Sequence, residues 1–216
     1  MTDRARVFIV IQTCPGREAA LADTLASMAQ SDIGEPDAVL VHPAGASIQE
    51  HFLSTLRAIA ASGREYGIRF EDDVLVNRHI VHNALRWPAL DRADFGAGWL
   101  FGSGFMHAQL RDVHEDAPEL PAPWPDVCGS LGVLVRVADV AELVSDVPEN
   151  WPPADGQQDR ALSRAVWWLD RRVYVHSPSL VEHNARHRST LAPDRVHAVG
   201  VHDSGGRWSE TWRRAS

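Results

Sequence analysis

The feature that most constrains the fold is a continuous, mainly β-branched and aromatic run near the start of the chain, RVFIVIQT at residues 6–13. β-Branched and aromatic residues without polar alternation are typical of a strand buried on both faces, as in a parallel sheet. Pro15 and Gly16 interrupt the run, and apolar residues at three- and four-residue spacing then predict a helix over 18–28. The chain therefore begins as the strand–helix unit of an α/β protein.

The same alternation continues through the first half of the chain. Apolar runs predict strands at 38–41 and 68–70, and apolar spacing predicts helices at 47–61, with Ser47 as N-cap, and at 77–87. Strands that alternate with helices through short links predict a parallel, doubly wound sheet. Because ligands of such sheets collect at the carboxyl ends of the strands, the side chains that follow each strand are candidates for a site.

The second half of the chain is less regular, and its glycine- and proline-rich segments separate shorter elements. The sequence predicts strands at 96–105, 129–137, 173–176 and 180–182, helices at 138–145 and 157–169, and a long loop at 114–127. The pattern then fades into a polar tail.

Length and composition limit the classes of protein to consider. The 216 residues suffice for one domain with a substantial core. The formal net charge of −8 argues against non-specific binding of nucleic acid through the whole surface. No apolar stretch approaches the ~20 residues that span a bilayer. The two cysteines, Cys14 and Cys128, suggest neither a disulfide framework nor a zinc site, so a reducing cytoplasm is the expected compartment.

Three adjacent carboxylates, Glu71, Asp72 and Asp73, follow the third strand-like run. Like charges repel, and a hard divalent cation such as Mg²⁺ or Mn²⁺ removes that repulsion because it takes oxygen ligands. Magnesium-type sites need only one or two protein carboxylates, since phosphates and water complete the shell. The alternative is a solvated strand end in which Asp73 caps the next turn. The metal site is the favoured interpretation.

Two later segments contain further candidates for a site. His183 directly follows an apolar strand and precedes Arg186 and Arg188, so an imidazole ligand and two phosphate-binding guanidinium groups could come from one segment. The alternative is a half-buried histidine that opens a basic surface loop. In DGQQD, Asp155 and Asp159 lie four apart at a predicted helix start. They could cap the helix, or they could act beside a reacting centre as base or as stabiliser of a cation.

In this order the motifs resemble those of a nucleotide-sugar-dependent glycosyltransferase of the GT-A type, from residue 7 to about residue 189. VIQTCPGREAALADTLASM looks like the first strand and helix of that fold, and RFEDDV looks like its D-x-D or E-D-D metal motif. GSLGVLVRVADVAELV, DGQQDRAL and SPSLVEHN are similar to the later segments beside the donor sugar, under the anomeric carbon and at the metal.

The resemblance implies an α/β fold with one GT-A-like, Rossmann-like domain, whose mixed, mainly parallel sheet is flanked by helices. Its nucleotide-binding half would be 1–95, its donor-sugar and acceptor half 96–190, and its polar tail 191–216. It implies Asp73 and His183 as metal ligands for Mn²⁺ or Mg²⁺. The implied donor-binding residues are Thr13, Arg17, Glu71, Asp72, Gly129, Ser130, Arg186 and Arg188, and the candidate catalytic residues are Asp155, Gln158 and Asp159. Relatives often use an acid at the end of the second strand to read uracil, so His42 leaves the base open.

The sequence thus predicts a metal-dependent enzyme that moves a sugar from a nucleotide diphosphate sugar to a glycan or small molecule, with inversion or retention undecided. A metal-dependent nucleotidyltransferase or phosphohydrolase is the second hypothesis, and a binding module without turnover is the third. Trp208, Trp212 and the arginines of the tail leave a nucleic acid acceptor open as a minority hypothesis. The favoured interpretation of the tail is docking on the domain or at the interface of a homo-oligomer.

Overall fold

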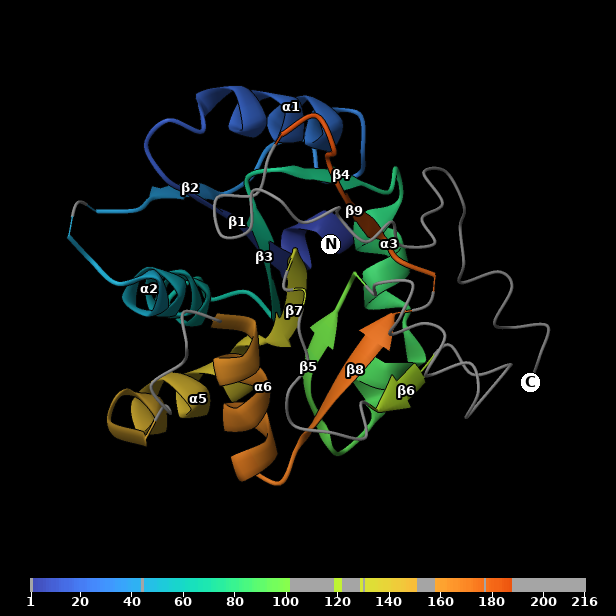
Figure 1. Ribbon diagram of the computed structural model, residues 1–216. Coiled ribbons are helices and arrows are strands. Elements are labelled where there is room, and N and C mark those ends of the chain that lie inside the picture. The colour runs from blue at the N-terminus through green and yellow to red at the C-terminus, as the bar shows by residue number, and fades with distance from the viewer. Residues whose placement is uncertain are drawn as a thin grey trace.

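The protein, in a computed structural model, is built around a mixed β-sheet with helices on both faces (Figure 1). The structure describes residues 2–43, 45–101, 119–121, 129, 131–150, 158–176 and 178–187. Within these residues, no helix combines the length and the apolar character that crossing a bilayer requires.

The elements of the first half alternate between strands and helices. They are η1 (Asp3–Arg6), β1 (Val7–Thr13), α1 (Glu18–Ala29), β2 (Ala38–Val41), α2 (Ile48–Ala60), β3 (Tyr66–Glu71), β4 (Val74–Val76), α3 (Ile80–Leu85) and η2 (Pro88–Asp91). The second half has β5 (Phe95–Trp99), β6 (Glu119–Pro121), β7 (Gly132–Arg136), α5 (Val137–Asn150), α6 (Gln158–Trp168), β8 (Arg172–His176) and β9 (Val181–His183).

In the described part of the chain, the main sheet has seven strands in the order β2-β1-β3-β7-β5-β8-β6. β1 is parallel to β2 and β3, and β5 is parallel to β8, whereas β7 is antiparallel to both β3 and β5, and β6 to β8. Five strands therefore run one way and two the other. Phe70, near the end of β3, pairs with Gly132 at the start of β7. The turn before β7 consequently lies at the same sheet edge as the carboxyl ends of β1 and β3.

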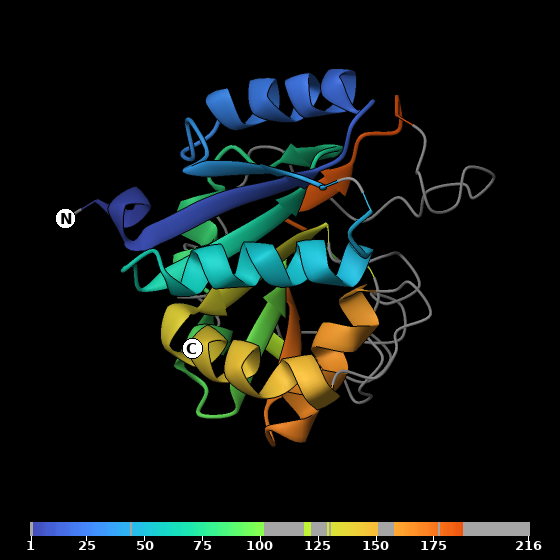
Figure 2. The same ribbon diagram turned by 90° about the vertical axis from the view of Figure 1, so that its left-hand side faces the viewer.

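Apolar side chains fill both faces of this sheet. Val10 of β1 packs with α2, α5 and α6, which face the viewer in Figure 2. Its neighbours Ile9 and Ile11 point to the other face and pack in the cluster that contains residues of α1 and α3. Successive residues of a strand face opposite sides, so an uninterrupted apolar run is required where both sides are covered. The run at 6–13 follows from this requirement.

Most of the predicted elements of the first half are confirmed, including the N-cap of α2, where Ser47 Oγ accepts a hydrogen bond from Glu50 N at 3.0 Å. The helix predicted over 77–87 is shorter and begins at Ile80. The reason is a side-chain turn before it, in which Asn77 Oδ1 accepts from His79 N at 2.7 Å. Pro88 then begins the separate turn η2 instead of extending the helix.

Two predictions for the sheet need correction. The alternation of elements predicted a parallel, doubly wound sheet, but β7 enters between β3 and β5 in the opposite direction. The long loop predicted over 114–127 contains the short strand β6. Pro121 ends β6, and β6 lies at the edge of the sheet, where proline is tolerated because one side of the strand needs no ladder partner.

A second, two-stranded sheet was not predicted as such. β4 pairs antiparallel with β9, and its register places Val74 opposite His183. The outer edge of β4 is bonded to α1, whose Thr24 and Ser27 hydroxyls accept from Val74 N at 2.9 Å and Val76 N at 3.0 Å. This small sheet connects a late segment of the chain to the acids that precede β4.

Candidate functional site

The acidic cluster lies where β3 ends and the chain turns into β4, beside the carboxyl end of β1. Asp72 and Asp73 are buried, with 6% and 4% of their surface exposed. Thr24 Oγ1 of α1 also lies 2.8 Å from the carbonyl oxygen of Asp72, so α1 fixes the backbone of the turn from the side opposite the sheet. The two carboxylates are therefore held by rigid elements rather than by a surface loop.

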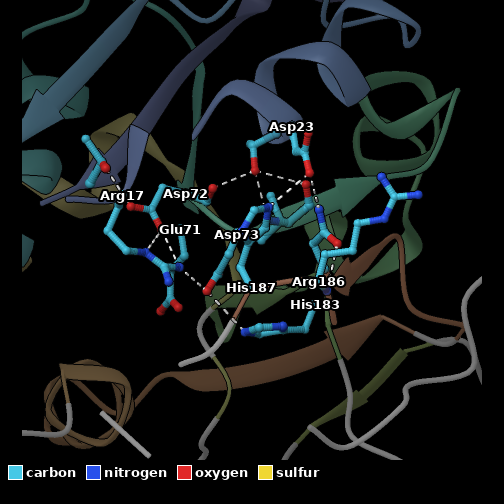
Figure 3. Close-up of polar contacts among 12 residues, drawn as sticks. Arg17, Asp23, Glu71, Asp72, Asp73, His183, Arg186 and His187 are labelled. Atoms are coloured by element: carbon cyan, nitrogen blue, oxygen red, sulfur yellow. Dashed lines mark hydrogen bonds and ion pairs between the residues drawn. The ribbon is translucent and has the colours of Figure 1, made fainter. Parts of the chain in front are cut away.

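Asp72 is neutralised by residues from the end of β1 and the start of α1. Thr13 Oγ1 donates to Asp72 Oδ2 at 2.5 Å, and Arg17 donates from Nε at 3.1 Å and Nη2 at 2.9 Å to Asp72 Oδ1. Arg17 Nη2 also donates to Asp73 Oδ2, so one guanidinium bridges both acids (Figure 3). Thr13 and Arg17, both predicted to bind the donor, are thus joined to the acidic cluster.

Asp73 and His183 meet across the small sheet, as the sequence resemblance implies for two metal ligands. His183 Nε2 lies 3.2 Å from Asp73 Oδ2, and Asn184 N donates to the carbonyl oxygen of Asp73 at 2.7 Å (Figure 3). Burial alone would raise the pKa of Asp73, but His183 and Arg17 together hold it below its usual value. Burial alone would lower the pKa of His183, and contact with Asp73 raises it instead.

Asp73 and His183 could together hold a divalent cation. Asp73 Oδ1 is buried and accepts no hydrogen bond from any residue that the structure describes. Two ligands at right angles, each about 2.1 Å from an ion, stand roughly 3 Å apart, which agrees with the 3.2 Å between the imidazole nitrogen and the carboxylate oxygen. No group of three or more His, Cys, Asp or Glu among the described residues could hold a metal. Two protein ligands suffice where phosphates and water supply the others.

Glu71 belongs to a different set of contacts from its two neighbours. Arg69, which is 1% exposed, donates from Nη1 to Glu71 Oε1 at 3.3 Å and from Nη2 to Gln12 Oε1 at 2.6 Å. Gln12 Nε2 donates to Gln158 Oε1 at 3.3 Å, and Gln158 Nε2 donates to Glu71 Oε1 at 3.2 Å. These four residues close a ring of hydrogen bonds, which we call the Arg69 ring.

The direction of every bond in the Arg69 ring follows from its two charged members. Arginine only donates and an ionised carboxylate only accepts, so Gln12 must turn its oxygen to Arg69 and its nitrogen to Gln158. Gln158 must then turn its nitrogen to Glu71. Burial raises the pKa of Glu71 and the charges of Asp73 and Asp159 raise it further, while Arg69 opposes them. The ring thereby fixes the amide of Gln158, a candidate catalytic residue, at the first turn of α6.

Asp159 has backbone partners for both carboxylate oxygens. Its Oδ2 accepts from Gly129 N at 2.7 Å and its Oδ1 from Arg160 N at 2.9 Å. Gly129 has φ of +95°, a conformation that favours glycine, and a Cβ there would lie 3.1 Å from Phe101 Cδ1. Asp159 thus fixes the turn before β7 at the site edge. A direct part for Asp159 in a reaction stays a prediction.

The segment after His183 is bound to α1. Asp23 Oδ2 accepts from Asn184 Nδ2 at 3.2 Å and lies 2.9 Å from His187 Nε2. Arg186 belongs to the same segment, but its guanidinium points away from Asp73 and Arg17 (Figure 3). The remaining predicted residues, Ser130, Asp155 and Arg188, lie outside the described residues.

A pair of histidines lies on the other side of Thr13. His51, in the first turn of α2, places Nε2 3.2 Å from the carbonyl oxygen of Thr13, and the His42 and His51 rings meet edge to face with centroids 4.9 Å apart. Burial, and then the neighbouring His42, lower the pKa of His51. His51 is therefore a neutral ring partner for His42, which follows the second strand, and the sequence did not predict it.

Three further residues of the site were also missed, and two left a signal in the sequence. Arg69 stands in an apolar strand two residues before Glu71, so the two side chains share one face of β3. Gln12 is a polar residue near the end of the run at 6–13, and it pairs in register with Glu71. Thr24 gives no such signal, because a threonine in the apolar face of a helix also fits ordinary packing.

Comparisons with known proteins give a likeness of fold. Neither the protein-family models nor the curated protein sequences contain a match. A197 from STIV is 14% identical with a TM-score of 0.51, over 94% of this chain and 97% of that one. S. aureus TarS 1–349 is 13% identical with a TM-score of 0.54, over 81% of this chain and 59% of that one. A glycosyltransferase involved in the glycosylation of the major capsid of PBCV-1 is 13% identical with a TM-score of 0.48, over 82% and 94%.

The likeness is one of fold. It agrees with the predicted fold class in that a mixed, mainly parallel sheet flanked by helices is confirmed. The chain spans 59% of the length of TarS 1–349. Sequence identities of 13–14% extend the likeness no further than the fold.

Proposed function

We propose that the protein transfers a sugar from a nucleotide diphosphate sugar to an acceptor hydroxyl, with Mn²⁺ or Mg²⁺ held by Asp73 and His183. The observation that carries the proposal is the pair of candidate ligand atoms at the carboxyl edge of the sheet, Asp73 Oδ2 and His183 Nε2, 3.2 Å apart. The fold shared with TarS 1–349, at a TM-score of 0.54, is compatible with the same reaction class.

The residues around this pair suit a diphosphate and a sugar. When bound, the metal ion would supply Lewis-acid stabilisation to the diphosphate that leaves the sugar. Arg17 adds a fixed positive charge beside the same position, since its guanidinium already contacts Asp73. Thr13 ends β1 next to Asp72, and the His42–His51 pair flanks the backbone of Thr13 on the side where a base would lie.

The sugar would lie toward α6 and the turn before β7. Gln158 is held in one orientation by the Arg69 ring, so its amide can support positive charge on the sugar only by its carbonyl oxygen, which now accepts from Gln12. Gln158 is therefore proposed to position the donor rather than to remove a proton. The acceptor is proposed to be a glycan or small molecule, and inversion and retention remain two outcomes of a product assay.

A thermal-shift panel of nucleotide-sugars with and without Mn²⁺ tests this proposal. We expect one nucleoside diphosphate sugar to raise the melting temperature only in the presence of the metal, since ligand binding to the folded state stabilises it. If nucleoside triphosphates raise it and no nucleotide-sugar does, a nucleotidyltransferase or phosphohydrolase replaces the proposed reaction.

The variant Asp73→Asn provides the internal control of that panel. It removes one ligand charge but leaves Asp72 to pair with Arg17, so we expect a folded protein without metal-dependent donor binding. Circular dichroism would establish the fold, and the thermal shift would report the binding. A variant that still shows the full metal-dependent shift would contradict the assignment of Asp73 as a ligand.

A further inference from the structure

Arg17 and a metal ion compete for the same carboxylate oxygen. Asp73 Oδ2 is the atom that Arg17 Nη2 contacts, and it is also the oxygen that faces His183 Nε2 at 3.2 Å. An ion placed between Asp73 Oδ2 and His183 would share that oxygen with a guanidinium nitrogen. Two positive charges on one oxygen lie within about 5 Å of each other, a separation at which their repulsion is strong inside a protein.

Because the acidic cluster and Arg17 are buried, their charges interact strongly. The Asp72 and Asp73 side chains are 8% and 6% exposed and that of Arg17 is 12%, so water screens their charges poorly. A buried carboxylate without a partner is strongly unfavourable. In the absence of a metal ion the acidic cluster therefore needs Arg17, because Asp73 has no other arginine or lysine partner among the described residues.

We infer that Arg17 is an internal counter-ion that holds Asp73 until a divalent cation replaces it, and that it then turns the released N–H toward the donor phosphates. This inference rests on the proposed function. The geometry allows the exchange because Arg17 has two separate contacts with Asp72, from Nε at 3.1 Å and from Nη2 at 2.9 Å. Nε can keep Asp72 while Nη2 leaves Asp73. The arginine would thus stay at the site and change only one partner.

The counter-ion role predicts opposite effects on two ligands. Without Arg17, the metal ion no longer displaces a positive charge, so Mn²⁺ alone should bind about tenfold more tightly or better. A nucleoside diphosphate, measured at saturating Mn²⁺, should bind more weakly because it loses an arginine partner. A residue that only maintains the fold would weaken both.

Isothermal titration of Mn²⁺ into Arg17→Gln is the direct test. This variant leaves two buried carboxylates without their arginine. The double variant Arg17→Gln with Asp72→Asn removes one of these carboxylates and so restores the charge balance. It too should bind Mn²⁺ more tightly than the wild type. Arg171→Gln is the matched control. Arg171 directly precedes β8, at the opposite edge of the sheet, and pairs with Asp139 and Glu142 of α5. The Arg171→Gln variant should bind Mn²⁺ as the wild type does.

The outcomes separate the inference from the proposed function. Tighter Mn²⁺ binding in both Arg17 variants, lost when Asp73→Asn is added, supports the counter-ion role. Equal or weaker Mn²⁺ binding in the two Arg17 variants overturns the inference, while metal binding by the wild type would leave the proposed function standing. If neither the wild type nor any variant binds Mn²⁺, the inference and the metal-dependent reaction are both wrong.

Discussion

At the residue scale, two arginines divide the charges of the acidic cluster between them. Arg17 pairs with Asp72 and Asp73, and Arg69 pairs with Glu71. Three adjacent acids are tolerated because Glu71 turns to Arg69, whereas Asp72 and Asp73 share Arg17. Thr13 adds a contact to Asp72 and His183 one to Asp73. The sequence predicted the cluster and its place at the end of a strand. It did not predict how the charges are balanced, because Arg17 reaches the acids across the fold.

Arg69 offers the sharpest stability prediction of the site. Arg69→Met replaces a buried guanidinium with an uncharged side chain of similar shape. Glu71 and Gln12 lose their hydrogen bonds from Arg69 and Glu71 loses its paired charge, so we expect a loss of about 3 kcal/mol in the free energy of unfolding. Urea unfolding would measure the loss. Adding Glu71→Gln removes the uncompensated acid and should recover part of it, which is a double-mutant cycle. Equal stability of Arg69→Met and the wild type would contradict a structural role for the Arg69 ring.

Tyr174 gives a prediction for alkaline pH. Burial, together with the hydrogen bond that its hydroxyl donates to Asp94 Oδ1 at 2.8 Å, raises the pKa of Tyr174 to about 12. The folded state therefore keeps a proton that the unfolded state loses near pH 10. The stabilising contribution is complete below pH 10 and decreases as the pH rises toward 12.

Absorbance at 295 nm would test this in Tyr66→Phe, because the chain has two tyrosines and that variant keeps Tyr174 alone. The expected midpoint lies near 12, with circular dichroism to follow the fold. A midpoint near 10 in a protein that is still folded would show that the Asp94 bond does not form.

At the scale of elements, periodicity predicted those that are long and regular. β1, α1, β2, α2 and β3 were found because apolar runs and helical spacing are local patterns. β4 is three residues long, directly behind the acids, and its pairing with β9 depends on a segment far along the chain. Local sequence carries no such information. His183 was predicted from its place directly after an apolar strand and from the resemblance of SPSLVEHN to a late strand of the family. The β4–β9 pairing explains how it reaches Asp73.

The direction of β7 was equally hidden from local patterns. The first four residues of Gly132–Arg136 are apolar and buried whichever way the strand runs, because both faces of the sheet are covered. Its antiparallel pairing with β3 and β5 depends on the path of the preceding connection. The correction matters for the site, since the turn at Gly129 lies beside Asp159 only because β7 starts at the carboxyl edge.

The contact between α2 and β3 is set by a glycine. A Cβ at Gly67 would lie 2.2 Å from Ile59 Cγ2, so the helix could not keep its distance from the strand. We expect Gly67→Ala to lower the free energy of unfolding by about 1–3 kcal/mol through overpacking. The loss should be smaller when Ile59→Ala removes the clashing methyl group, so the two substitutions would be non-additive in chemical denaturation. Additive losses would contradict a direct contact.

At the scale of the whole molecule, the candidate site is assembled from both halves of the chain. Thr13, Arg17 and the acids come from the first half, and Gln158 and His183 from the second. The mixed sheet makes this possible because β7 and β3 are neighbours and β9 reaches β4. The division into a nucleotide-binding half and a donor-sugar half stays a prediction, as do the nucleotide base and the acceptor.

The central claim is metal-dependent sugar transfer at Asp73 and His183. The most direct test measures the release of nucleoside diphosphate from a panel of nucleotide-sugars in the presence of Mn²⁺. We predict release from one donor by the wild type and by Asp139→Asn, a control that changes a buried, arginine-paired acid away from the site. Asp73→Asn and His183→Ala should lower that rate at least about a hundredfold, as expected when a group that stabilises developing charge is lost. Absence of release from every donor, or full release by folded Asp73→Asn, would contradict the account.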